Sequence, residues 1–219
     1  MAVSTGRLAA ALGAVALLAA GAWYMLSHRA ANVPAPVVTP PTFVGSDRCA
    51  DCHAAQAGAW RASQHALAMQ QAADGTVLGD FDDASFSHAG VTTTFFRRDG
   101  KPFVRTDGPG GELADFEVKY TFGVAPLQQY LLELPGGRLQ ALSVAWDSRP
   151  ADAGGQRWFH LYPGEQVDHR DELHWTRPAQ NWNFMCSDCH STGVQKNYDA
   201  ASHTFATKFA EISVGCEAC

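Results

Sequence analysis

Three Cys-x-x-Cys pairs account for all six cysteines of this 219-residue chain, and they constrain its fold more than any other feature. Two of the pairs lie in the repeated stretches CADCH and CSDCH, and the third lies in the terminal CEAC. The pairs are Cys49 and Cys52, Cys186 and Cys189, and Cys216 and Cys219. A chain that uses them for one chemistry must build the same local structure at positions far apart in the sequence.

The spacing within and between the pairs separates three possible uses. A disulfide across two intervening residues closes a short loop and removes little chain entropy. Zinc ribbons place two such pairs about 15–20 residues apart, whereas the gaps here are 133 and 26 residues. Covalent haem requires two thiols at i and i+3 and an imidazole at the next position, where His53 and His190 stand. The motifs therefore favour two c-type haem sites, with zinc and disulfide bonding as the alternatives.

The terminal pair stops one residue before the position of such an imidazole. Because the earlier pairs are interpreted as haem sites, we expect Cys216 and Cys219 to belong to a third haem site that is cut before its His. We therefore expect the chain to be incomplete at its C-terminus. A terminal disulfide or dithiol is the alternative.

Axial ligands are the next requirement, since a haem iron in an electron-transfer protein is normally ligated on both sides by His or Met. His65 follows Cys52 by 13 residues on a predicted helix, next to Trp60 and Met69. His160 in WFHLY and His174 in LHW lie among large aromatic residues shortly before the second motif. The predicted iron ligands are His53, His190, His65, His174 and His160.

The N-terminal region has the pattern of an export segment. Residues 8–26 form a continuous apolar run after Arg7, nearly the length of about 20 residues that spans a bilayer, with Trp23 and Tyr24 near its end. This predicts an inner-membrane anchor, and cleavage near Ala22 with secretion is the alternative. In either case we expect the body of the protein in the periplasm.

The rest of the chain divides by composition. We expect a signal or anchor segment over residues 1–30, a Pro-rich linker over 31–42 and a multihaem domain over 43–219. A helix is predicted over Ala54 to Gln71. Strand patterns separated by Gly-rich turns predict a β-rich insertion over 85–146. The predicted strands are Val91 to Arg98, Pro102 to Thr106, Asp115 to Phe122, Leu127 to Leu134 and Leu139 to Trp146. The predicted fold class is α+β, with helical or loop segments that bind haem at both ends and an antiparallel meander between them.

The charge pattern limits the partners. The formal net charge is -6 without a run of Lys or Arg, which excludes the electrostatic signature of a nucleic-acid binder. A redox partner that is steered by charge should present a basic docking face.

Several stretches resemble a known family. GSDRCADCH followed by WRASQHALAM is similar to the cytochrome c554 type of multihaem domain. YTFGVAPLQQY, NWNFMCSDCHST and the terminal CEAC resemble exported bacterial multihaem proteins in which tetratricopeptide repeats often follow. The resemblance implies covalent haem, implies His65 as a distal ligand, and implies a His after the last cysteine.

Two functions fit these features. The first is a periplasmic cytochrome that binds two to three haems and transfers electrons, for which no catalytic residue is assigned. The second is a multihaem oxidoreductase that acts on a small nitrogen or sulfur oxyanion, which requires an iron with an open side. The surplus of His favours filled axial positions and hence the electron-transfer protein.

Overall fold

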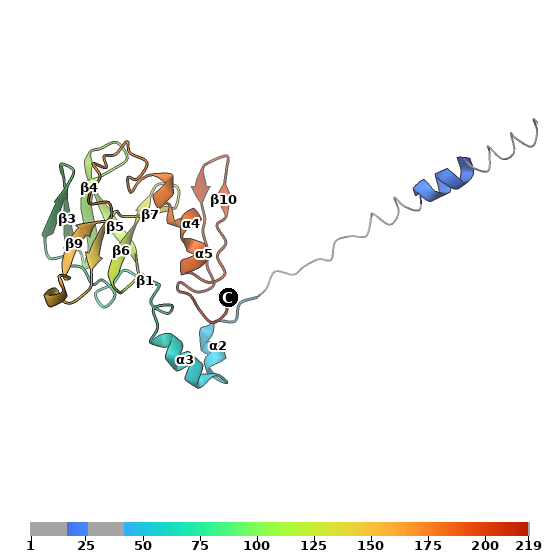
Figure 1. Ribbon diagram of the computed structural model, residues 1–219, viewed down its shortest axis with the longest axis horizontal. Helices are drawn as coiled ribbons and strands as arrows, with labels where there is room; N and C mark the ends of the chain where they lie inside the picture. The colour runs from blue at the N-terminus through green and yellow to red at the C-terminus, as the bar shows by residue number, and fades with distance from the viewer. Residues whose placement is uncertain (1–16, 26–41, 219) are drawn as a thin grey trace, which may run out of the picture. The chain divides into compact units, whose positions relative to one another are not determined.

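The computed structural model describes residues 17–25 and 42–218 (Figure 1). The unit Phe43–Cys219 contains every element from α2 onward, and the unit Met1–Thr42 contributes a helix over residues 17–25, drawn in blue in Figure 1.

The helix over residues 17–25 corrects one prediction. Across the described ranges 17–25 and 42–218, no helix has the length and apolar character needed to cross a membrane. The predicted inner-membrane anchor over residues 8–26 is therefore not supported, because a span needs about 20 residues. Residues 8–16 and 26 lie outside the described residues, as does the predicted linker before Thr42.

The unit Phe43–Cys219 contains four α-helices, two 3-10 helices and eleven strands among its described residues. The helices are α2 (Ser46–Ala50), α3 (Ala54–Arg61), η1 (Ala151–Ala153), η2 (Pro178–Gln180), α4 (Trp182–Met185) and α5 (Ser187–His190). The strands are β1 (Met69–Gln71), β2 (Ala84–His88), β3 (Val91–Arg98), β4 (Lys101–Asp107), β5 (Leu113–Phe122), β6 (Leu127–Leu134), β7 (Arg138–Ala141), β8 (Val144–Asp147), β9 (Arg157–His160), β10 (Tyr198–Asp199) and β11 (Thr204–Phe205).

The predicted fold class, α+β with haem-binding helical or loop segments flanking a meander over 85–146, is wrong. The described residues are mostly antiparallel β, and a nine-stranded sheet has the order β2-β3-β4-β5-β6-β8-β9, with β1 paired to β5 and β7 paired to β6. β1 comes before the predicted meander and β9 after it, so the sheet extends into both flanks. Strands of three or four residues carry too little alternation to be recognised in a sequence.

The central strands follow the sequence pattern closely. β3 and β6 have the bounds predicted for them, and Asp99-Gly100 joins β3 to β4 with positive φ angles of 52° and 76°. Two left-handed residues are what a tight two-residue hairpin requires. The predicted strand Leu139 to Trp146 is instead split into β7 and β8, which both pair with β6.

The predicted helix over Ala54 to Gln71 is much shorter in the structure. α3 ends at Arg61, and the chain turns before Met69 begins β1. Met69 is 1% exposed and pairs with Phe122 of β5. Pairing with the sheet therefore outweighs the helix propensity of this Ala- and Gln-rich stretch.

An aromatic cluster closes the sheet on itself. Trp158 of β9 stacks on Phe95 of β3 with ring centroids 3.5 Å apart, and Phe81 meets both rings edge to face. β9 thereby also comes into contact with β2 at the other end of the strand order. The main core lies inside this curved sheet and contains Val104, Val118, Tyr130, Leu132 and Trp146, among others.

β6 buries both of its faces, and this arrangement positions the second cysteine motif. Leu132 belongs to the main core, whereas the adjacent Leu131 belongs to a smaller cluster with Met69, Phe122 and Trp182. Successive side chains of a strand point to opposite faces. The outer face of β6 therefore provides the apolar surface on which Trp182 of α4 packs and against which Cys186 lies.

Candidate functional site

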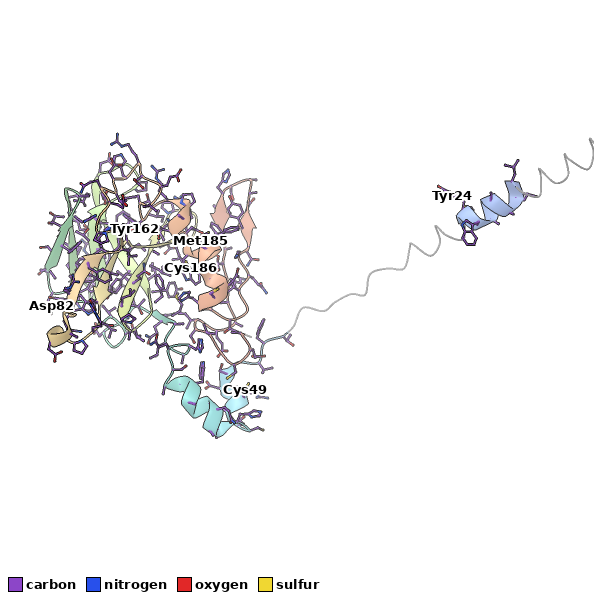
Figure 2. The ribbon with its side chains drawn as sticks, viewed as in Figure 1. Tyr24, Cys49, Asp82, Tyr162, Met185 and Cys186 are labelled. Atoms are coloured by element: carbon purple, nitrogen blue, oxygen red, sulfur yellow. The ribbon has the colours of Figure 1, made fainter. Side chains whose placement is uncertain are left out.

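The first cysteine motif forms a single turn between α2 and α3 (Figure 2). The carbonyl oxygen of Cys49 accepts hydrogen bonds from the backbone N–H groups of Cys52 at 3.3 Å and His53 at 2.9 Å. Positions i, i+3 and i+4 share one face of a helical turn. The turn therefore brings two thiols and one imidazole to the same side, and Cys52 and His53 are exposed.

The second motif repeats this turn. The carbonyl oxygen of Cys186 accepts hydrogen bonds from the backbone N–H groups of Cys189 and His190, each at 3.1 Å. Cys186 lies between α4 and α5, as Figure 2 shows, and Cys189 is exposed. The same backbone pattern occurs at both complete motifs although 133 residues lie between Cys52 and Cys186.

Asparagine side chains attach the second motif to the sheet. Asn181 accepts a hydrogen bond from the backbone N–H of Phe184 and so caps α4, and it donates to Gln140 Oε1 at 2.9 Å. Asn183 accepts from the backbone N–H of Leu139 at 2.7 Å and donates to the Gly137 carbonyl oxygen at 3.1 Å. Because these partners lie in β7 or directly before it, a short helix that could not be stable alone is anchored to the sheet.

The cysteines keep their thiols free. Cys49, Cys52, Cys186, Cys189 and Cys216 form no disulfide, and Cys219 lies outside the described residues. Burial raises the pKa of the Cys186 thiol, and its neighbour Cys189 raises it further. The described residues contain no group of three His, Cys, Asp or Glu that could hold a metal ion.

The His190 side chain packs against an apolar surface. Its ring meets the ring of Phe122 edge to face, with centroids 5.4 Å apart, and its Nδ1 atom is buried with no hydrogen-bond partner among the described residues. A buried polar atom without a partner costs roughly 1–3 kcal/mol. Two free thiols, the adjacent imidazole and an apolar surface fit covalent haem.

Cys216 of the third cysteine pair lies against the first motif. The backbone N–H of Cys216 donates to Ser46 Oγ of α2 at 2.8 Å. The pKa of the Cys49 thiol is raised, first by desolvation and then by the neighbouring Cys216. The structure therefore brings together two motifs that are separated by most of the domain.

His65, the first predicted distal ligand, lies at the same place. Its carbonyl oxygen accepts a hydrogen bond from the backbone N–H of Val214 at 3.2 Å, and the Val214 carbonyl oxygen accepts from Trp60 Nε1 at 2.8 Å. The His65 side chain is exposed. The role of His65 as a ligand stays a prediction. Its backbone is hydrogen-bonded to Val214, which is two residues before Cys216 in the sequence.

His160 and His174 lie elsewhere, around a small cavity of about 30 Å³ in the sheet, whose lining contains no cysteine. His174 is 4% exposed, and its ring nitrogens lie 2.8 Å from Thr176 Oγ1 and 3.1 Å from Asp107 Oδ2. The His160 ring stacks on His88 with centroids 4.0 Å apart. Desolvation, and next the charge of His88, lower the pKa of His160. The structure does not bring these two histidines to a cysteine motif, and their role as ligands stays a prediction.

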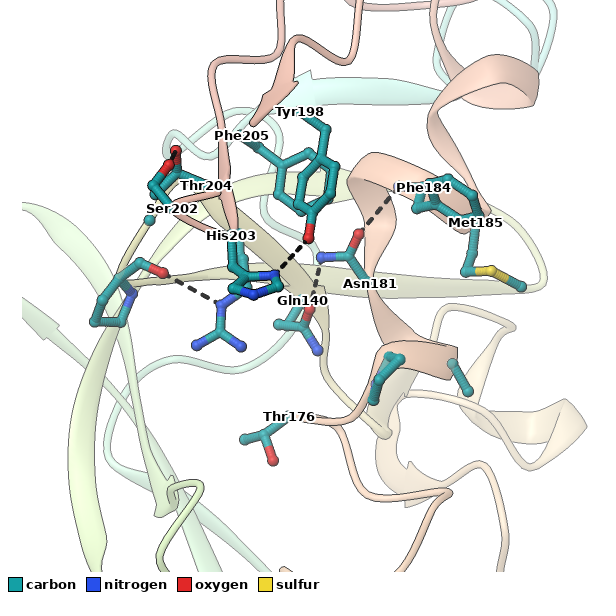
Figure 3. A pocket seen from close by; sticks show the side chains of 15 residues that line it. Gln140, Thr176, Asn181, Phe184, Met185, Tyr198, Ser202, His203, Thr204 and Phe205 are labelled. Carbon is teal, nitrogen blue, oxygen red and sulfur yellow. Dashed lines mark hydrogen bonds between the residues drawn. The ribbon is translucent and has the colours of Figure 1, made fainter. Parts of the chain in front are cut away.

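His203 is not among the predicted iron ligands. It lines an open pocket of about 1000 Å³, drawn in Figure 3, and its Nδ1 atom lies 2.9 Å from the Tyr198 hydroxyl. Phe184 and Met185, which directly precede Cys186, line the same pocket. The hairpin of β10 and β11 that forms one side has two-residue strands, which leave no periodic signal in the sequence.

Comparison with known proteins supports the interpretation of the motifs. The family model described as cytochrome c554 and c-prime matches residues 48–79 and 159–219. These two segments contain the first two motifs, the cysteines of the third, and His65. The intervening residues 80–158, which form most of the sheet, lie outside the match. No curated protein and no solved structure matches the chain.

Proposed function

The chain contains a cytochrome c554-type domain, and from this premise we propose that it is a periplasmic multihaem cytochrome that transfers electrons. Its two complete motifs would each hold one haem c. The observation that carries the proposal is the identical turn at Cys49 and Cys186, with free thiols at i and i+3 and an imidazole at the next position.

The proposal assigns attachment and ligation to residues of the turns. Cys49 and Cys52, and likewise Cys186 and Cys189, would hold the two macrocycles through thioether bonds, and His53 and His190 would ligate iron. When bound, haem supplies a one-electron centre whose potential depends on ligands and surroundings.

The residues around the second motif hold it in a fixed position and exclude water from it. Trp182 is fully buried below the turn, and Phe122 lies edge-on against the His190 ring. Asn181 and Asn183 fix α4 on β7 by side-chain hydrogen bonds. Because these contacts exist before any electron arrives, little reorganisation is needed at this site.

A third haem on Cys216 and Cys219 is part of the proposal. His65 is the distal ligand that we propose at the first motif, since the fold holds it beside Val214 and the first motif's own helix pair. Export to the periplasm is supported by the apolar run over residues 8–26, and cleavage near Ala22 would release the protein there.

The first experiment counts covalent haem. The full chain would be produced in a host with the c-haem maturation machinery and analysed by the absorption spectrum of the pyridine complex after denaturation. We expect at least two haems per chain. The double variant C49A/C52A should lose one haem, and C186A/C189A should lose another.

The variant C216A/C219A is the matched control, because it removes a cysteine pair but leaves both complete motifs. It should retain two haems. Absence of covalent haem in the wild type would end the proposal. A high-spin ferric signal, or rapid binding of cyanide, would instead favour the oxidoreductase that acts on a small nitrogen or sulfur oxyanion, because both require an open iron.

A further inference from the structure

The first and third cysteine motifs share one junction, formed by residues 44–46 and 211–217. Within it, Ser46 Oγ accepts a hydrogen bond from the backbone N–H of Cys216 at 2.8 Å. Cys49 is three residues after Ser46 on α2 and therefore on the same helix face. Desolvation, and next the neighbouring Cys216, raise the pKa of the Cys49 thiol, in keeping with this placement.

Two glutamates hold this junction together. Glu217 accepts hydrogen bonds from the backbone N–H groups of Val44 at 2.9 Å and Gly45 at 2.7 Å. Glu211 accepts from the backbone N–H of Ser46 at 3.0 Å and from its hydroxyl at 2.9 Å. A charged acceptor strengthens each of these bonds. The position of Cys216 beside α2 is thus fixed from both sides.

Gly215 permits the close approach. A Cβ atom at this position would lie 2.6 Å from Ser46 Oγ and would also collide with the Glu211 carboxylate. The backbone N–H of Gly215 donates to Thr192 Oγ1 at 2.8 Å. Only a residue without a side chain lets the segment before Cys216 reach α2 in this way.

From this geometry we propose that Cys49 and Cys216 form a disulfide site in the haem-free chain. Both thiols are free, Cys216 is exposed, and Cys49 is partly exposed. A small-molecule disulfide such as oxidised glutathione is the oxidant. Both thiols lose hydrogen, one S–S bond forms between Cys49 and Cys216, and the oxidant is reduced to two thiols.

The consequence for maturation rests on the proposed function. A disulfide between the motifs consumes one thiol of the first haem site and one of the third. Haem attachment at Cys49 then requires a reductant and separation of the two thiols. Loss of Cys216 should therefore raise haem occupancy at the first motif when reductant is limiting.

The disulfide can be tested on the full chain made without haem. Trypsin separates the three cysteine pairs, because it cleaves after Arg48, Arg61 and Lys208. The variant C52S/C219S leaves Cys49 and Cys216 as the possible partners at the junction. After treatment with oxidised glutathione and digestion without reductant, mass spectrometry should detect residues 49–61 linked to 209–219 in most molecules.

The variant C49S/C216S is the matched control, since it keeps Cys52 and Cys219 on the same two peptides. It should give at least about tenfold less of the linked product. Equal linkage in both variants, or none in C52S/C219S, would overturn the proposal. Gly215→Ala in the C52S/C219S background should also lower linkage, whereas Gly58→Ala, which meets no atom within 4 Å, should not.

The disulfide proposal and the haem proposal can be refuted independently of each other. Linkage is measured on protein that contains no haem, whereas haem occupancy is measured on matured protein. If linkage is found but C216S matures like the wild type at limiting reductant, the disulfide site stands and its competition with haem attachment is refuted. If no haem binds at all, the proposed function falls while the linkage result is unchanged.

Discussion

Asn183 attaches the second cysteine motif to the rest of the fold through its side-chain hydrogen bonds. It is 1% exposed, and its amide makes bonds to the backbone of Leu139 and Gly137 and to Thr207 Oγ1 at 2.9 Å. An amide has both acceptor and donor atoms, so it can bond to both kinds of backbone group at once. No aliphatic residue can replace it here.

Asn183→Ala should therefore weaken the second motif selectively. We expect a loss of about 1–3 kcal/mol in the free energy of unfolding, because the partly buried N–H of Leu139 loses its acceptor. Haem occupancy should fall at Cys186 and Cys189 and stay unchanged at the first motif. Urea unfolding and haem counting on separated peptides measure the two effects.

Asn197→Ala is the control for that variant, because Asn197 is exposed and donates to the Ala206 carbonyl oxygen at the surface. It should leave haem occupancy unchanged at both motifs, although alanine at its left-handed φ of 44° costs some stability. Equal losses at the two motifs would contradict the role given to Asn183.

For His174, the sequence and the structure point to different roles. The aromatic surroundings in the sequence predict a haem ligand, but the structure pairs its ring with Asp107 and Thr176 inside the sheet. Those bonds would have to break before a ring nitrogen could reach iron.

His174→Ala should separate these roles. We expect an unchanged low-spin haem spectrum and a loss of roughly 3 kcal/mol in the free energy of unfolding, because the Asp107 carboxylate loses its buried partner. Asp107→Asn should be equally neutral for the spectrum. A lost low-spin signal in His174→Ala alone would instead restore His174 as a ligand.

At the scale of elements, the end of β8 is fixed to the loop before β9 by charge. The Asp147 carboxylate is 5% exposed and accepts two hydrogen bonds from the Arg149 guanidinium, at 3.0 and 2.7 Å. These bonds, chiefly, lower the pKa of Asp147 to about 2. The ion pair therefore helps to register β8 with β9, which brings Trp158 into the core.

Asp147 should contribute to stability in a defined pH range. Its pKa is lower in the folded than in the unfolded state, where it is about 3.9, so the stabilisation is complete above about pH 5 and is lost as the pH falls toward 2. The wild type should exceed Asp147→Asn in stability at pH 6, and the difference should shrink at pH 3. Urea midpoints at the two pH values measure it, and a constant difference would contradict the assignment.

At the scale of the whole molecule, the net charge of -6 should steer partners. Electron transfer from a basic single-haem cytochrome should slow at least about tenfold between low and high salt, since salt screens long-range attraction. Transfer from a small neutral reductant should change little. Stopped-flow absorbance measures both rates, and equal salt dependence would exclude electrostatic docking.

The predictable parts of this protein depend on short stretches of chain. The turn that unites Cys49, Cys52 and His53 requires only five residues, and Asp99-Gly100 specifies the β3–β4 hairpin with two. The same reasoning failed for Ala54 to Gln71, where Met69 leaves the helix to pair with Phe122. Helix propensity is a weak local preference that burial of one large side chain can exceed.

The sequence by itself determined the chemistry of the motifs, because thiols at i and i+3 followed by His depend on one helical turn. Only the tertiary structure decided that the sheet takes strands from both flanks, that His174 meets Asp107, and that Cys216 lies against the first motif. The last two contacts join residues that are 67 and 170 positions apart. Their energies come from burial and hydrogen bonding across the fold, for which a local pattern leaves no trace.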